Sequence, residues 1–237
     1  MTWLILLIKT LMIFTKTLYF NFLSLHPRAN ITQIKKNWAL SILKDLDINL
    51  KITHQCITNS KLVLVGNHVS FLDIIVLMAA HPEVVFLSKQ EVSKWPIIGS
   101  GAKRVGTIFV NRGSIKSKAQ ARLQIEKILA SPKSTVHLAG FPSGTTSLTE
   151  NIQWKKGLFE IAKSTQTLVQ PFYISYKPLR ECAYIDDDTL FTKLMLLLKY
   201  KNKTAQLTWG TPQIIQDTQI DIKQIQSWIT QQDVEAK

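Results

Sequence analysis

The sequence predicts an α/β fold with a mixed, largely parallel sheet flanked by helices, preceded by an N-terminal amphipathic two-helix membrane hairpin. Two observations favour this class. From Asn49 onward, short apolar runs alternate with helical patterns, as in layered α/β proteins. Before that point, the stretch from Trp3 to Leu25 is far more hydrophobic than the rest. We therefore divide the 237 residues into a membrane-associated helical hairpin, residues 1–46, and an α/β domain, residues 47–237.

The first helix is predicted from Trp3 to Leu25, long enough to reach across a bilayer but interrupted by Lys9 and Lys16. These lysines are seven residues apart and share one helical stripe with two threonines. Such a helix is expected to lie in the membrane interface, with its lysines reaching lipid phosphates. A signal peptide is disfavoured because the charges lie inside the apolar core. A buried core helix remains the alternative.

A second helix follows the break at His26–Arg28, with Asn30 or Thr32 as its N-cap and its end near Leu46. Two amphipathic helices joined by a proline turn predict a membrane-seated hairpin. The predicted apolar face of this helix consists of Ile34, Trp38, Ile42 and Leu46.

The later elements follow from apolar periodicity and turn residues. Strands are predicted over Asn49–Cys56, Lys61–Val65, Val84–Ser88, Gly106–Val110, Thr135–Ala139, Leu168–Tyr176 and Ala205–Trp209. Helices are predicted over Phe71–Ala80, Ile115–Leu129, Lys156–Ser164, Thr189–Tyr200 and Ile222–Ile229. The Leu-rich helix at Thr189–Tyr200 is a further candidate for contact with the membrane. Pro171 lies inside a predicted strand, which indicates an edge position or a bulge.

Charge and cysteine content narrow the function classes. The chain has 29 Lys and Arg against 16 Asp and Glu, a net charge of +13 that favours nucleic acid or anionic lipid as partner. Because the basic residues form no block and are not interleaved with regular aromatics, we expect no nucleic-acid partner. Cys56 and Cys182 fit neither a disulfide framework nor a metal cluster. We expect plain interior or strand cysteines, no metal and a reducing cytoplasmic setting.

The stretch from Asn67 to Asp73 carries the strongest chemical signal, because an apolar strand delivers His68 to the start of a helix. Asp73 can accept from one ring nitrogen and fix the tautomer, leaving the other nitrogen as a base. Five residues on a helix separate two side chains by about 140°, so His68 must precede the helix and Asp73 lie inside it. An incidental polar residue before a capped helix is the plain alternative.

Three further stretches end predicted strands, where α/β folds place their sites. Gly106–Arg112 presents Arg112, which suits bidentate bonding to a phosphate or carboxylate. The loop Phe141–Ser147 offers hydroxyls and backbone N–H groups to an anion. The last stretch is Val169–Ile174, around a proline. Taken alone, Arg112 is equally typical of a solvated arginine at a turn, and Phe141–Ser147 is more typical of a plain loop.

In order and chemistry, these four stretches resemble the membrane-associated glycerolipid and lysophospholipid acyltransferases, of which the 1-acylglycerol-3-phosphate type is best known. Asn67–Asp73 matches the N-H-x-S-x-x-D first block of that family, and Gly106–Arg112 matches its second block. Phe141–Ser147 matches the third block, normally F-P-E-G-T-R-S, and Val169–Ile174 resembles the fourth. The resemblance covers about residues 61–176 and identifies residues 47–237 as the acyltransferase domain.

The resemblance implies an enzyme of phospholipid biosynthesis that moves a fatty acyl group from acyl-CoA or acyl carrier protein to a lysolipid hydroxyl. The expected acceptor is 1-acyl-sn-glycerol-3-phosphate. His68 is then the general base and Asp73 orients it, with no cofactor and no metal. The expected partner is an anionic bilayer, at the cytoplasmic face of a membrane (the inner membrane in a bacterium). The implied substrate-binding residues are Asn67, Ser70, Lys89, Arg112, Phe141, Pro142, Ser143, Gly144, Thr145, Thr146 and Ser147.

The third block departs from the family, because Ser143 and Thr146 stand where Glu and Arg are usual. Losing one guanidinium contact to a phosphate costs roughly 1.5–3 kcal/mol. One alternative is a different headgroup, as in lyso-ornithine lipid, whose acyltransferases resemble the T-T-S form. Another is that Lys103 or Arg104 supplies the missing charge. The last is a non-catalytic lipid-binding homologue.

Overall fold

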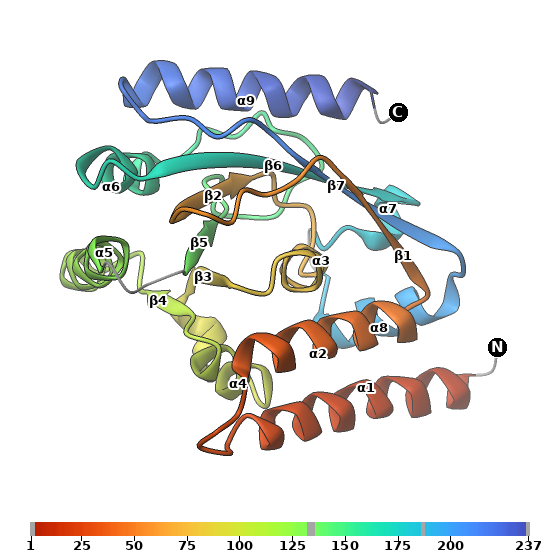
Figure 1. The fold of residues 1–237 in the computed structure, drawn as a ribbon. Helices are drawn as coiled ribbons and strands as arrows, with labels where there is room; N and C mark the ends of the chain where they lie inside the picture. The colour runs from red at the N-terminus through yellow and green to blue at the C-terminus, as the bar shows by residue number, and fades with distance from the viewer. Residues whose placement is uncertain (1–2, 132–135, 186–187, 236–237) are drawn as a thin grey trace.

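The computed structural model describes residues 3–131, 136–185 and 188–235 (Figure 1). Within these residues, seven strands form one sheet, in which every neighbouring pair is parallel except the antiparallel pair β6–β7. The predicted mixed, largely parallel sheet is confirmed. Thr135, where one strand was predicted to begin, lies outside the described residues. The spatial order is β1 (Ile48–Thr53), β7 (Lys203–Trp209), β6 (Leu168–Lys177), β2 (Leu62–Gly66), β5 (His137–Gly140), β3 (Val84–Lys89) and β4 (Ile108–Val110).

Helices cover both faces of the sheet (Figure 1). One face carries α5 (Ile115–Ala130), α6 (Gly157–Ser164) and α9 (Thr218–Glu235). The other carries α1 (Trp3–Leu23), α2 (Ile31–Asp45), α3 (Leu72–Ala80) and α8 (Leu190–Lys199). In the described part of the chain there are also three short helices, η1 (Gln90–Lys94), α4 (Ile98–Arg104) and α7 (Leu179–Cys182).

The fully buried strand β2 explains why its sequence is a continuous apolar run. Successive side chains of a strand point to opposite faces. Leu62 and Leu64 accordingly enter the hydrophobic core beneath α3, whereas Val63 and Val65 enter the core beneath α5 and α6. Both faces of the sheet are therefore covered along β2, up to its last residue, Gly66.

Helix α1 is oriented opposite to the prediction, because its polar stripe faces the protein. Thr10 is buried, and Thr17 accepts a hydrogen bond from the indole of Trp38 (3.2 Å). Lys16 pairs with Asp45 at the end of α2, so the prediction that it reaches lipid phosphates is wrong. The exposed side chains are the apolar ones, including Trp3, Leu4, Ile8, Leu11, Met12, Leu18, Tyr19 and Phe22. By length and composition, α1 is apolar enough to cross a membrane.

Helix α2 begins as predicted, with the side chain of Asn30 accepting from the backbone N–H of Gln33 (3.0 Å). Its apolar face, however, is occupied within the protein. Ile42 and Leu46 are buried in the same core as α3. The predicted two-helix hairpin is thus confirmed only as two consecutive helices, and the continuous exposed apolar face belongs to α1.

Pro171 lies in an interior strand, so the predicted edge position is wrong. β6 has β7 on one side and β2 on the other, and Pro171 is paired in register with Val65. Its carbonyl accepts from the N–H of Gly210 (2.8 Å), just beyond the end of β7. A proline is tolerated there because it lies at the limit of the β7 ladder, whose first pair is Phe172 with Trp209.

Other differences concern element ends and short helices. β1 ends at Thr53, so Cys56 lies in a loop and not in a strand. Between β3 and β4 the chain forms η1 and α4, which are too short to show a hydrophobic period. α9 is longer than predicted and runs from Thr218 to Glu235.

We expect Leu64→Ala to lower the free energy of unfolding by about 2–5 kcal/mol, because it leaves a cavity in the central strand. Leu123→Ala is the matched control, since this leucine of α5 is exposed and should cost about 0.5 kcal/mol or less. Chemical denaturation of the parent protein and both variants, in the same detergent, measures the loss in the free energy of unfolding. Equal losses would contradict the assignment of β2 to the core.

Candidate active site

Parallel pairing brings the predicted stretches to one edge of the sheet. The spatial order β2, β5, β3, β4 places four carboxyl ends side by side. His68 follows β2, the loop Phe141–Ser147 follows β5, Lys89 ends β3 and Arg112 follows β4. β6 lies on the other side of β2 and runs past the end of that strand. These side chains, distant in the sequence, therefore surround one edge.

His68 and Asp73 form a hydrogen-bonded pair, with His68 Nδ1 2.8 Å from Asp73 Oδ2. His68 precedes α3 and Asp73 is its second residue, as the spacing required. The side chain of Asp73 is fully buried, whereas that of His68 is 19% exposed. Because the carboxylate holds Nδ1, the opposite nitrogen, Nε2, is the one presented to a ligand.

Asp73 has three further hydrogen-bond donors besides the imidazole. Its Oδ2 accepts from the backbone N–H groups of Val69 (2.8 Å) and Ser70 (3.0 Å), and its Oδ1 accepts from the Tyr176 hydroxyl (2.6 Å). Burial, followed by the charge of Asp73, raises the pKa of Tyr176 well above its usual range, so the phenol stays a donor. Sequence reasoning missed Tyr176, because a tyrosine in a strand carries no local signal.

Two predicted substrate-binding residues support the backbone beneath the site. Asn67 is buried, and its amide both donates to the carbonyl and accepts from the N–H of Ile174 in β6 (2.7 and 2.8 Å). The Asn67 side chain thus continues the hydrogen bonding between β2 and β6 beyond the last residue of β2. Ser70 is also buried, and its hydroxyl accepts from the N–H of Leu72 (3.3 Å). Both residues fix the turn that carries His68.

The third block packs directly against the histidine. The ring of Phe141 is stacked on the imidazole of His68, with centroids 3.9 Å apart and planes 12° apart. The N–H of Ser147 donates to the carbonyl of His68 (2.7 Å). Pro142 and Ser143 are buried beneath the loop, and the Ser143 hydroxyl donates to the carbonyl of Thr145 (2.9 Å).

An apolar cavity of about 440 Å³ opens at this site. Its polar end is lined by His68, Lys89, Arg112, Phe141, Gly144, Thr145 and Thr146, all predicted from the sequence. From there it extends between α3, α4 and the first two helices, along apolar side chains that include Ile13, Phe14, Phe20, Trp38, Met78 and Trp95. Such a cavity suits an apolar substrate whose polar group lies beside His68.

A cluster of cations surrounds the third block. Arg112 donates to the carbonyl of Gly144, whose φ of +75° is in the left-handed region that favours glycine. Lys155 reaches the same glycine from the following loop, so that a β-carbon on Gly144 would collide with its ammonium group. Partial burial, then the charges of Arg112, Lys89 and Lys118, lower the pKa of Lys155. An anion bound here would relieve this repulsion.

Lys155 was not predicted, although it follows the third block by only eight residues. The two cations that the sequence suggested instead, Lys103 and Arg104, are exposed in the last turn of α4. Burial also lowers the pKa of Arg112 from its usual value. The charge beside the third block therefore comes from Arg112, just after β4, and from Lys155, in a loop that folds back.

Comparisons with known proteins identify the family of this chain. A sequence model of the acyltransferase family matches residues 47–175. The lyso-ornithine lipid O-acyltransferase of Pseudomonas aeruginosa is 31% identical over 182 residues, which are 73% of this chain and 68% of that protein. The 1-acyl-sn-glycerol-3-phosphate acyltransferase of Neisseria meningitidis serogroup B is 40% identical over 74 residues, 31% of this chain and 29% of that protein.

The fold is similar to that of a solved structure, the 1-acyl-sn-glycerophosphate acyltransferase PlsC from Thermotoga maritima. The TM-score is 0.64 at 16% sequence identity, with 98% of this chain and 97% of the other covered. Together with the family match over residues 47–175, these similarities show that the chain belongs to the acyltransferase family.

Proposed function

We propose that this protein is an O-acyltransferase that moves a fatty acyl group from a thioester donor, acyl-CoA or acyl carrier protein, to the free hydroxyl of a lysolipid. One observation carries the proposal: the bonded pair of His68 and Asp73 lies at the polar end of a long apolar cavity. A base beside a hydroxyl and a space for hydrocarbon are what this reaction needs. Membership of the acyltransferase family supports the reaction type.

In the proposed mechanism, Asp73 holds the proton of His68 on Nδ1, and Nε2 takes the proton of the lysolipid hydroxyl. The hydroxyl oxygen attacks the thioester carbonyl, forming the new ester bond as the carbon–sulfur bond breaks. The imidazolium returns its proton to the departing thiolate. Asp73 stabilises the imidazolium, and its bonds from Tyr176 and two backbone N–H groups keep the carboxylate in place. This mechanism calls for no cofactor and no acyl-enzyme.

The membrane supplies the substrate in this proposal. Helix α1 lines the cavity with Ile13, Phe14 and Phe20 and exposes an apolar face on its outer side. A face of this kind is stabilised by contact with the hydrocarbon of a bilayer. We place the enzyme at the cytoplasmic face of the membrane, where thioester donors are made. The excess positive charge favours an anionic bilayer.

The cation cluster supports an acceptor with an anionic headgroup, and Lys155 replaces the charge that Thr146 lacks. For a phosphate, 1-acyl-sn-glycerol-3-phosphate is the acceptor that fits. A second candidate is an amino-acid lysolipid of the lyso-ornithine type, which presents a carboxylate. Ser143 and Thr146 favour it, as does the alignment over 73% of the chain with a lyso-ornithine lipid O-acyltransferase.

We expect His68→Ala to lower the rate of acyl transfer by roughly 10²–10⁴-fold, the usual contribution of a general base. The control is His54→Ala, which removes an exposed histidine before β2 and should leave the rate unchanged. Transfer of a radiolabelled acyl group to lysolipid in vesicles measures both variants. An active His68→Ala enzyme would remove His68 from the mechanism. A parent protein inactive on every lysolipid would indicate a non-catalytic lipid-binding homologue.

We expect Lys155→Ala to reduce kcat/KM about tenfold for acceptors with an anionic headgroup and to leave a neutral monoacylglycerol unaffected. Lys156→Ala is the matched control, because this neighbouring lysine is also exposed and its side chain makes no capping hydrogen bond to α6. A panel of 1-acyl-sn-glycerol-3-phosphate, lyso-ornithine lipid and monoacylglycerol identifies the acceptor. The headgroup assignment fails if both lysine variants behave alike on all three.

We expect Leu11→Gln combined with Leu18→Gln to weaken vesicle binding at least about tenfold. The reason is that each leucine side chain, when buried in the membrane, contributes about 1.5–3 kcal/mol to binding. Glutamine changes no charge, so attraction to anionic lipid is preserved. Leu123→Gln is the control, because this leucine on α5 is also well exposed. Sedimentation with anionic vesicles gives the affinities. Unchanged binding by the double variant would show that α1 is not the membrane contact.

A further inference from the structure

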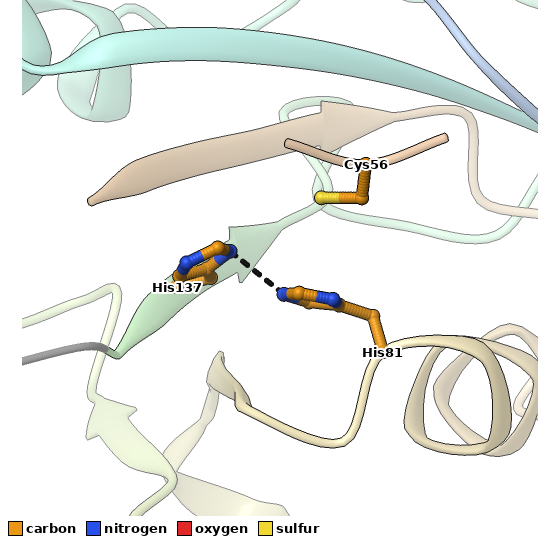
Figure 2. A group of neighbouring side chains, drawn as sticks. All are labelled: Cys56, His81 and His137. Carbon is orange, nitrogen blue, oxygen red and sulfur yellow. Dashed lines mark hydrogen bonds between the residues drawn. The ribbon is translucent and has the colours of Figure 1, made fainter. Parts of the chain in front are cut away.

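A cluster of Cys56, His81 and His137 lies outside the proposed acyl-transfer site (Figure 2). The three residues come from separate parts of the chain. Cys56 lies in the loop between β1 and β2, His81 directly follows α3, and His137 is the first residue of β5. One potential ligand atom of each residue lies within 4.8 Å of the other two. The side chains converge on one space.

The two imidazoles face each other edge to edge, with His81 Nε2 2.7 Å from His137 Nδ1. Both are buried, with relative exposures of 4% and 2%, and Cys56 is partly buried. An imidazole binds a metal through the lone pair of a ring nitrogen, and each ring presents one nitrogen to the same space.

The three donor atoms determine which metals the cluster can bind. Two imidazole nitrogens and one thiolate are ligands that suit zinc and similar divalent transition metals, and not magnesium or calcium. Donor atoms around a tetrahedral zinc ion lie about 3.3–3.6 Å apart, given bonds of about 2.0–2.3 Å. The nitrogen pair at 2.7 Å has to open slightly, and the sulfur has to move closer by rotation of one side chain.

A carboxylate near His81 is a further feature that metal sites share. A carboxylate oxygen of Glu83 lies 4.0 Å from Nδ1 of His81, on the side of the ring opposite His137. The separation is longer than a hydrogen bond, but a carboxylate on this side of the ring favours a proton on Nδ1 and so leaves Nε2 as the ligand. The charge of buried Lys35 acts in the opposite direction, and Glu83 compensates for it.

We propose that Cys56 Sγ, His81 Nε2 and His137 Nδ1 bind a divalent transition metal ion such as Zn²⁺, with a fourth position left for water. Binding releases the thiol proton to solvent, and the proton that the two facing nitrogens share moves to the other nitrogen of its own ring. The ion joins the β1–β2 loop, the end of α3 and the start of β5. Asp73 and His81 are at opposite ends of α3, about 12 Å apart along the helix, so the ion stabilises the helix that carries the carboxylate. This inference does not depend on the proposed function.

The experiment uses the untagged full-length chain after treatment with a chelator. Zn²⁺ is titrated in competition with a chromophoric chelator, and Co²⁺ is used as a spectroscopic probe. We expect one zinc ion per chain, a thiolate-to-cobalt charge-transfer band, and a higher midpoint of thermal unfolding with Zn²⁺. Failure to bind one equivalent of Zn²⁺, or a cobalt spectrum without the thiolate band, would overturn the proposal.

Matched cysteine variants show whether the ion is at this position. We expect Cys56→Ala to lose the charge-transfer band and at least about a hundredfold in zinc affinity, whereas Cys182→Ala keeps both. Glu83→Gln should weaken binding about tenfold without changing the stoichiometry. Circular dichroism confirms that each variant is folded. Equal effects of the two cysteine variants, or no effect of Cys56→Ala, would assign the ion to another place and refute the site.

Discussion

The buried carboxylate of Asp73 is the constraint on which the site depends. A buried charge is strongly unfavourable unless hydrogen bonds replace the water it loses. Four donors do this here: the imidazole of His68, two backbone N–H groups of the turn before α3, and the Tyr176 hydroxyl. The turn, the first residues of α3 and the far part of β6 must therefore be in place together. If any of these parts were displaced, the Asp73 carboxylate would lose a hydrogen bond that offsets its burial.

The sheet order follows from the same requirement. Tyr176 reaches Asp73 because β6 runs parallel to β2 and continues beyond it, guided by the Asn67 amide. On the other side, β5 delivers Phe141 onto the ring of His68. The imidazole is thus fixed on one edge by a carboxylate and on one face by an aromatic ring, and Nε2 is the ring nitrogen that Asp73 leaves available at the cavity.

Sequence reasoning predicted the local pair of the site from its spacing, and the distant residues Arg112 and Phe141 from motifs at the ends of predicted strands. His68 and Asp73 were found because five residues and one turn determine their meeting. Tyr176 was missed because it lies 103 residues from Asp73, and only the tertiary fold relates them. Lys155 was missed for a similar reason, since its loop folds back on Gly144. The class of sheet was predictable from alternating runs, whereas the orientation of α1 was not. A helical period shows that two faces differ, but not which one meets the protein.

The inverted helix α1 has a kinetic consequence. Its inner side forms a wall of the cavity, and its outer side is apolar. If the outer side rests in lipid, the acceptor moves laterally from the leaflet to the site and crosses no water. Turnover then depends on the mole fraction of lysolipid in the leaflet and not on its amount per volume of solution. At a fixed concentration of the thioester donor, diluting the membrane with inert lipid would slow such an enzyme, whereas diluting the vesicles in buffer would not.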